Sequence, residues 1–455
     1  MSQDKTTPEY RPVKDAHKTL GLWSIRRALT FAFTAAVVLL IAAWFLLLFL
    51  LGSPSHAKPK PLETKDLLDL LKLVFALVAG VGALVALVTA YRRQRVDEAA
   101  GERAERVQAH VEYGQGVELL GHDRAAVRLG GLYSLEHLAQ DHPYYRQTVT
   151  DFVCSYLRMP FPALPAGHDD QSEQPDDHTA QDPELQVRLT AQRLLKRHLT
   201  TGAPGDHRPT YWDGIHIDLT GAHLIDFDFT HCHATSATFT KTQFSGDAVF
   251  GGAQFSGDAG FNGAQFSRAA RFGETRFMGA TMFGGAQFSG DAGFGGAQFS
   301  GPARFSGAQF MGAAGFGRAQ FMGPAGFSRA QFSGAARFGE TRFMEATMFG
   351  GAQFRGDAGF NGAQFMEAAW FSGAQFSGDA RFDRGAGFGG AQFSGDAWFD
   401  RAQFSGDARF DGAQFEREPN FADATASHPN DNHVWPSPWL AQAVTLDTAK
   451  LIRES

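Results

Sequence analysis

The tripeptide His231-Cys232-His233 is the most metal-like cluster in the chain, because imidazole and thiolate are the usual zinc ligands. Cys232, however, falls on a position that the surrounding pattern directs inward, so its two neighbours should point away from it. The other histidines that stand out share no ligand spacing and have no cysteine or carboxylate cluster beside them: His110, His122, His137 and His142. We therefore predict no metal site and no cofactor.

Seven aspartates occupy the same Gly-Asp-Ala step of a repeated sequence: Asp247, Asp258, Asp291, Asp357, Asp379, Asp396 and Asp407. An active site brings unlike groups to one point, whereas a repeat places like groups in translated rows. The GGxGxD run of calcium-binding repeats is absent. We interpret the aspartates as solvated corner residues and assign no catalytic residue. The alternative is an enzyme with an unrecognised site in the helical region, where no nucleophile stands beside a base.

A repeat of hydrophobic residues must position these rows. Positions 219, 224, 229, 234, 239 and 244 hold Leu, Leu, Phe, Ala, Phe and Phe, and the residue two before each is mostly small or apolar. From Phe244 onward the spacing alternates between six and five, so the working unit is eleven residues. Between Phe239 and Phe421, 34 phenylalanines keep this cadence, with one break at Phe376, Phe382 and Phe388 where two sixes adjoin.

This pattern resembles the pentapeptide repeat family, in which a central Leu or Phe is preceded two positions earlier by Ala. The resemblance implies a mainly β fold, a right-handed quadrilateral β-helix with the centre and the residue two before it pointing inward. Two eleven-residue units then make a coil of 22 residues, with the extra residue at a corner such as Gly257-Asp258, which tolerates unusual backbone angles. The segments 272–299 and 338–365 are nearly identical at an offset of 66, or three such coils.

The charge of the repeat bears on function. Some members of the family resemble duplex DNA and protect DNA gyrase, which requires a strongly acidic surface. Residues 239–421 hold 15 Lys plus Arg and 16 Asp plus Glu, so both DNA mimicry and nucleic-acid binding are disfavoured. We predict a non-enzymatic scaffold that presents its β-helix to an unidentified protein partner. A DNA-mimic protector or inhibitor of gyrase stays as an alternative.

Two uncharged hydrophobic runs precede the repeat. Residues 28–51 are 24 positions without a charge, which is enough for a helix to cross a bilayer of ~30 Å, and residues 73–90 are equally uncharged. Lys and Arg favour the outer flanks over the loop, so both termini should be cytoplasmic. We predict a transmembrane hairpin in the lipid bilayer of the inner (plasma) membrane. A cleaved signal peptide near Ser55-His56-Ala57 is the alternative for the first run.

Between and beyond these features the chain divides further. Helical periodicity predicts helices at 125–138, 142–159 and 185–198. Gly82, Ala86 and Ala90 form a small-residue stripe on the second span that is consistent with a homo-oligomer. The predicted order is a cytoplasmic tail at 1–27, the hairpin at 28–91, an α-helical region at 92–200 with a disordered linker at 160–183, the repeat array at 211–421 and a cap or tail at 422–455.

Overall fold

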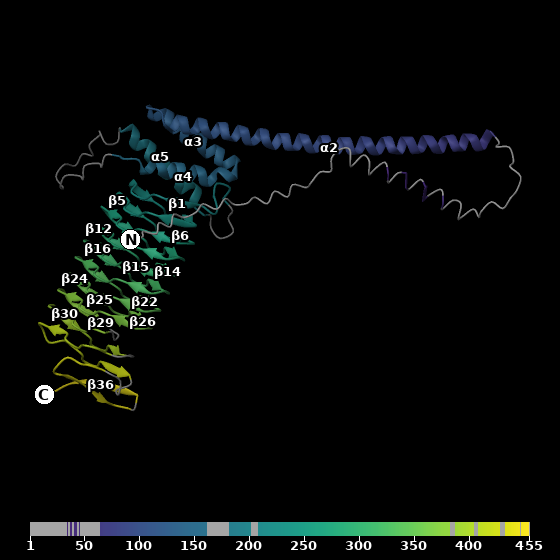
Figure 1. Cartoon of the computed structure of the whole chain (residues 1–455). Coiled ribbons are helices and arrows are strands. Elements are labelled where there is room, and N and C mark those ends of the chain that lie inside the picture. Colours follow the sequence, from purple (N-terminus) through teal and green to yellow (C-terminus); the bar gives the residue numbers. More distant parts are fainter. Residues whose placement is uncertain are drawn as a thin grey trace, which may run out of the picture. The chain divides into compact units, whose positions relative to one another are not determined.

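A computed structural model describes residues 34, 37, 38, 41, 42, 45, 64–161, 182–201, 208–382, 387–404, 408–427, 433–445 and 447–454. The chain forms two compact units, Met1–Val107 and Gln108–Ser455, each considered by itself. Figure 1 shows the long helix α2, the shorter helices and the stacked strands.

Helix α2 runs from Thr64 to Leu120 and dominates the described part of the first unit. We predicted a span that ends near residue 90 and a separate region from 92, but the helix continues across this point. The residues that follow Arg92 are good helix formers, and Arg93–Asp97 and Glu102–Arg106 add ion pairs at helical spacing.

No helix among the described residues is both long and apolar enough to cross a membrane. The predicted transmembrane hairpin is therefore not supported. Its first span, 28–51, lies almost wholly outside the described residues, and the signal-peptide alternative does so entirely.

The second unit contains a parallel β-helix of about nine turns, confirming the predicted mainly β solenoid. Its strands stack in four columns, and the first column presents glutamine in most of its strands: β2 (His223–Asp228), β5 (Gln243–Val249), β8 (Gln265–Phe266), β12 (Gln287–Phe288), β16 (Gln309–Phe310), β20 (Gln331–Phe332), β24 (Gln353–Phe354), β28 (Gln375–Phe376), β30 (Gln392–Phe393) and β33 (Gln414–Phe415). The second column continues from β2 and β5 into β9 (Ala270–Arg271), β13 (Ala292–Gly293), β17 (Ala314–Gly315), β21 (Ala336–Arg337), β25 (Ala358–Phe360), β29 (Ala380–Phe382) and β31 (Ala397–Trp398).

The other two columns are separate sheets. The third contains β3 (His233–Ala234), β6 (Gln254–Phe255), β10 (Arg276–Phe277), β14 (Gln298–Phe299), β18 (Gln320–Phe321), β22 (Arg342–Phe343) and β26 (Gln364–Phe365). The fourth contains β1 (His216–Asp218), β4 (Ser236–Thr238), β7 (Ala259–Gly260), β11 (Thr281–Met282), β15 (Ala303–Arg304), β19 (Ala325–Gly326), β23 (Thr347–Met348) and β27 (Ala369–Trp370). In Figure 1, β14, β22 and β26 follow one side of the solenoid, and β12, β16 and β24 follow another.

The predicted coil of 22 residues is confirmed by the strand register. Gln265 pairs with Gln287 and Phe266 with Phe288, and hydrogen bonds between neighbouring coils join residues 22 apart. Inside, phenylalanine rings of one column stack face to face, as Phe288 and Phe310 do with centroids 4.8 Å apart and planes 1° apart. Rings of different columns meet edge to face, so the core is a lattice of stacked and T-shaped aromatic contacts.

The two kinds of corner use glycine for different reasons. The extra residue lies at the Ser-Gly-Asp corner, as predicted, but glycine there is needed for close stacking: a Cβ on Gly301 would lie 2.6 Å from the carbonyl oxygen of Gly279. Left-handed angles recur at the other kind of corner, within the five-residue steps, for example at Gly252 (φ 66) and Glu274 (φ 58), and one also occurs at Gly246 (φ 80) of a Ser-Gly-Asp corner.

One coil is short. At the break seen in the sequence, Gln375 pairs with Gln392 and Asp396 bonds to Asp379, only 17 residues away. The first and second columns continue through this coil, and the fourth continues through bridges from Trp370 to Gly387 and on to Arg409. The third column ends at β26, and the next strand in its position, β32 (Gln403–Phe404), belongs to another sheet. This coil therefore has three strands where its neighbours have four.

Helices cover the amino-terminal coil: α3 (Ala125–Asp141), the 3-10 turn η1 (Pro143–Tyr145), α4 (Arg146–Arg158) and α5 (Pro183–Leu199). The Gln147 side-chain amide accepts from the main-chain N–H of His216 and donates to its carbonyl oxygen, both at 2.9 Å. Gln192 makes the same pair of bonds to Ile225 at 2.7 and 2.9 Å. Two glutamines thus take the place of a preceding strand at the exposed edges of β1 and β2.

The carboxyl-terminal coil is closed by a sheet of order β32, β34 (Thr425–Ser427), β36 (Thr448–Arg453) and β35 (Trp439–Ala443). Its last pairings are antiparallel, unlike those of the solenoid. Trp435 lies against the rings of Phe404, Phe410 and Phe421, and Trp439 lies against Phe421. The tail therefore covers the last rings of the core.

Replacing a ring in the middle of the array tests this lattice. Phe305 is fully buried and contacts rings in its own and in neighbouring columns. Phe305→Ala should reduce the free energy of unfolding by about 3 to 5 kcal/mol, seen as a lower urea midpoint. The adjacent, exposed Arg304 is the control, and Arg304→Ala should change stability by less than about 0.5 kcal/mol. Equal effects of the two substitutions would contradict the proposed core.

Candidate interaction site

The metal-like tripeptide does not converge on one point. Cys232 is fully buried, and burial raises the pKa of its thiol to about 12. His233 points outward, where its ring nitrogens bond to the Tyr211 hydroxyl at 2.8 Å and to the Ser256 hydroxyl at 2.6 Å. Throughout the part of the chain that the structure describes, no three His, Cys, Asp or Glu side chains are placed to hold a metal ion.

The second cysteine is also a packing residue. Cys154 lies on α4 in the core, and burial raises the pKa of its thiol to about 12. A thiol with such a pKa carries almost no thiolate at neutral pH and is a poor nucleophile. Neither cysteine therefore offers covalent chemistry in the folded protein.

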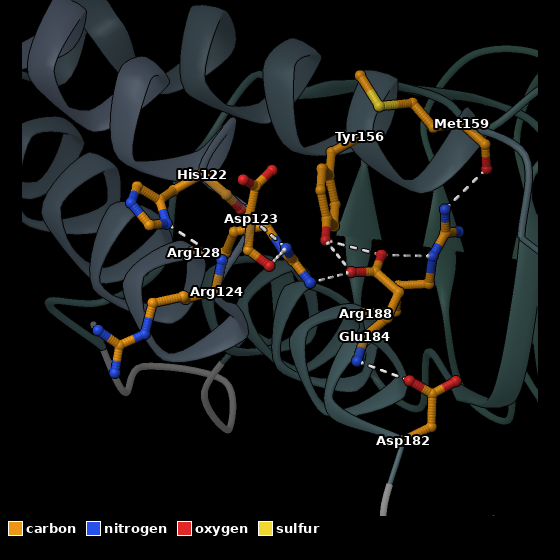
Figure 2. Close-up of polar contacts among 9 residues, drawn as sticks. All are labelled: His122, Asp123, Arg124, Arg128, Tyr156, Met159, Asp182, Glu184 and Arg188. Atoms are coloured by element: carbon orange, nitrogen blue, oxygen red, sulfur yellow. Dashed lines mark hydrogen bonds and ion pairs between the residues drawn. The ribbon is translucent and has the colours of Figure 1, made fainter.

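The helical region contains a buried ionic cluster around Glu184, shown in Figure 2. The Glu184 carboxylate accepts hydrogen bonds from Arg128 at 2.7 Å, from the Tyr156 hydroxyl at 2.8 and 2.9 Å and from Arg188 at 3.0 Å. The Arg188 guanidinium also donates to the carbonyl oxygens of Leu157 and Met159. The cluster thus joins α3, α4 and α5.

The geometry of this cluster indicates that it holds the helices together and is not a catalytic site. Both carboxylate oxygens of Glu184 already accept from side chains of the protein, so neither is free to take a proton from a substrate. Breaking such a buried group of charges leaves uncompensated partners and destabilises a fold strongly. The sequence signal for it was the helix start at Asp182, whose side chain caps α5 by accepting from the Glu184 N–H.

A second buried pair has the residue types of a catalytic dyad. His198 bonds through Nε2 to the Glu136 carboxylate at 2.7 Å and through Nδ1 to the carbonyl oxygen of Thr210 at 2.6 Å. Its ring stacks on Trp212 with centroids 3.9 Å apart. Because both ring nitrogens are occupied by the protein, the imidazole is positioned to tie α5 to the chain before the first coil.

The repeated aspartates have a role that the sequence did not reveal. Asp258 and Asp291 each accept a hydrogen bond from a main-chain N–H of the next coil, at 2.9 and 2.8 Å, and Asp357 and Asp379 make similar bonds. Each such carboxylate therefore couples one corner to the corner above it. The row joins coils to one another and is more than a solvated edge.

A polar hollow lies on the second column. It has a volume of about 410 Å³ and is open over Gly359, between Arg337 and Arg381. Asp357 and Asp379 also line it, but their carboxylates accept the corner hydrogen bonds described above. Its groups are translated copies of one another, which suits surface contact better than catalysis.

Exposed apolar side chains gather at the Ser-Gly-Asp corner that lies between the third and fourth columns. Met344 and Met366 lie one above the other there, exposed by 45% and 59%. Met348 and Trp370 pair in the fourth column, each exposed by 44%. We call these four residues the methionine patch. Met278 and Met322, exposed by 49% and 45%, lie in the same row as Met344 and Met366, and the other equivalent positions include Ser300, Arg304 and Gly326. The patch is the part of the row where exposed apolar side chains of both columns coincide in two successive coils.

Family models match the chain along the array that forms this surface. One described as pentapeptide repeats (9 copies) matches residues 239–287, 250–298, 272–320, 316–364, 338–386 and 388–429, and a second, described as pentapeptide repeats (8 copies), matches residues 215–246. The four-column solenoid with alanine two positions before most of the rings defines the class. The chain is a pentapeptide repeat-containing protein. No curated protein and no solved structure matches it.

Two ion pairs connect the helices to the first coil: Arg158 with Asp218 and Lys196 with Asp228. Partial burial alone would raise the pKa of each carboxyl, but hydrogen bonds outweigh it and hold both pKa values below the usual range. The bonds come from Thr220 and Arg158 for Asp218, and from Lys196 and Thr230 for Asp228.

These pairs predict a pH dependence. A carboxyl whose pKa is lower in the folded state stabilises the fold above its unfolded pKa of about 3.9, and this stabilisation is lost as pH falls through the folded pKa. At pH 7, the variant Asp218→Asn/Asp228→Asn should have a free energy of unfolding lower by about 0.2 to 1 kcal/mol per half-exposed pair, which is seen as a slightly lower urea midpoint. The difference should vanish well below pH 3.9. A difference that grows on acidification would contradict the assignment.

Proposed function

We propose that this protein is a non-catalytic scaffold whose β-helix binds a protein partner through the methionine patch. The observation that carries the proposal is the patch itself, a cluster of exposed apolar side chains on a surface whose other exposed positions are mostly Gln, Ser, Gly, Arg and Asp. Methionine is flexible and polarizable and is common at binding surfaces, and tryptophan is the residue most enriched among interface hot spots.

The rigidity of the solenoid supports this role. The main chain around the patch is fixed by hydrogen bonds to both neighbouring coils, as at Phe349, which donates to the Trp370 carbonyl oxygen at 2.7 Å, and at Phe327, which donates to that of Met348. A preformed surface does not need to be ordered on binding, which lowers the entropic cost of association.

We further propose that the amino-terminal part attaches this scaffold to the cytoplasmic side of the inner membrane. The uncharged run at 73–90 lies within α2, where Leu84 and Leu87 are exposed by 50% and 70%. Arginines follow it at 92, 93 and 95. Apolar side chains on such a helix gain free energy when they enter lipid, and flanking arginines favour the cytoplasmic side.

Replacing the patch tests the interaction. The variant Met344→Ser/Met366→Ser/Trp370→Arg introduces only residues that the same columns already hold, at Ser300 and Arg304. Its stability should therefore be close to that of the native chain, while crosslinking in expressing cells followed by mass spectrometry should show about tenfold less of each specific partner. The measurement compares individual partner proteins and not total captured protein.

The chain offers a matched control. Met311 is exposed by 52% at the diagonally opposite corner, in line with Ser289 and Ser333. Met311→Ser removes one exposed methionine but leaves the patch intact, so it should crosslink the same partners as the native chain. An identical partner list from the native chain and both variants would contradict the proposed site.

Membrane attachment is tested separately. The full chain should sediment with membranes and resist a carbonate wash, and Leu84→Lys/Leu87→Lys should release much of it, because lysine at the middle of a bilayer costs about 2.5 to 3.5 kcal/mol. Val107→Lys, placed later on α2 at a site that is 64% exposed, should have no effect. Release of the native chain by the wash would overturn this part of the proposal.

A further inference from the structure

The corner that carries the methionine patch departs from the repeat at one further position. In the two coils of the patch, the residue after each exposed methionine is a glutamate: Glu345 follows Met344, and Glu367 follows Met366. The four preceding coils hold glycine at this position of the same corner: Gly257, Gly279, Gly301 and Gly323. The two acidic residues therefore lie within the patch, on the corner that separates its two rows.

Glycine is the residue that close stacking favours at this position. A Cβ on Gly323, in the coil directly before Glu345, would lie 2.8 Å from the carbonyl carbon of Gly301. This distance is inside van der Waals contact, so a longer side chain requires the corner to shift. Glu345 and Glu367 place such a side chain in two successive coils. Residues that break a local packing rule are expected where a protein has a functional site.

The internal duplication isolates this change. The segments 272–299 and 338–365 differ at three positions, one of which is Gly279 in the first and Glu345 in the second. Both segments hold methionine immediately before this position and again three residues after it. The methionines are thus common to both segments, whereas the glutamate occurs in the segment that belongs to the patch.

Both carboxylates are free to meet a partner. Glu345 and Glu367 are exposed, and neither side chain makes a hydrogen bond or an ion pair with another described residue. The bond that the Thr347 hydroxyl donates to Glu345, at 3.1 Å, ends on the main-chain carbonyl oxygen. Elsewhere in the array an exposed glutamate is paired, as Glu340 is with Arg318 at 2.9 Å.

We propose that the partner of the methionine patch is an amphipathic helix with basic side chains at two positions four residues apart. Its Lys or Arg residues pair with Glu345 and Glu367, and its neighbouring apolar residues contact Met344, Met348 and Trp370. Side chains four apart on a helix are about 5 to 6 Å from each other, close to the ~4.8 Å between successive coils. The inference rests on the proposed function, because it names the class of partner for the same site.

The carboxylates give this site selectivity that an apolar patch lacks. A like charge placed against Glu345 or Glu367 is repelled, so the site rejects acidic helices of similar hydrophobicity. Loss of glycine at this corner thus weakens close stacking and adds discrimination between partners.

A direct test uses the full chain and two labelled helical peptides. The basic peptide is Leu-Lys-Lys-Leu-Leu-Lys-Leu-Leu-Lys-Lys-Leu-Leu-Lys-Leu, and the acidic peptide has Glu in place of every Lys. Fluorescence anisotropy should show about tenfold or more tighter binding of the basic peptide to the native chain. Glu345→Gln/Glu367→Gln should remove most of this preference, because glutamine keeps the shape of the side chain and removes its charge.

A second variant guards against a change in folding. Glu345→Gly/Glu367→Gly restores the residue that the preceding coils hold, so its urea midpoint should stay close to that of the native chain. It should lose the preference for the basic peptide to the same extent as the glutamine variant. A preference that survives in both variants would overturn the inference.

The chain offers a matched control. Glu274→Gln/Glu340→Gln removes two exposed glutamates at another corner and changes the net charge equally, so it should keep the native preference. An equal loss of preference in this control would also overturn the inference. The outcome is separable from that of the proposed function: if Met344→Ser/Met366→Ser/Trp370→Arg loses its cellular partners while the peptide preference does not depend on the patch glutamates, the scaffold role stands and the basic helix does not.

Discussion

Each coil of the β-helix depends on its neighbours for main-chain hydrogen bonds and for burial of its rings. A strand of two residues has no stability of its own, and a ring that projects inward is covered only by the rings one coil above and below it. The same offset of 22 residues governs the strand register, the ring stacking and the bonds of the corner aspartates. A change in the length of one coil would therefore disturb the strand register, the ring stacking and the aspartate hydrogen bonds together.

This dependence explains why many of the polar and aromatic contacts made by residues outside the array lie at its two ends. The glutamines of α4 and α5 imitate the main chain of a preceding strand, and Trp435 and Trp439 cover the last rings. The buried cluster around Glu184 holds the three covering helices together, so its charges serve the first coil indirectly. What looks like an assembly of catalytic residue types is the amino-terminal closure of the solenoid.

The periodic part of the fold could be predicted because its cause is local and repeated. Eleven-residue units with a ring at fixed spacing require a 22-residue coil, and the register confirms it. The clamps by Gln147 and Gln192 could not be predicted, since each joins residues that are 69 or 33 positions apart without any repeat. The repeat pattern, by contrast, correctly placed the Cys232 side chain inward. The continuity of α2 was missed because hydrophobicity stops near residue 90 while helix propensity does not.

The near-identity of residues 272–299 and 338–365 acquires a further meaning in such a molecule. Because both ends are closed by unique elements, the array can gain or lose length only in its interior, and a gain or loss of whole coils keeps all four faces aligned. Each added coil would move the methionine patch away from the covering helices by about 4.8 Å without rotating it. The protein is in this sense a graduated ruler, on which copy number sets the distance between its amino-terminal closure and whatever it holds.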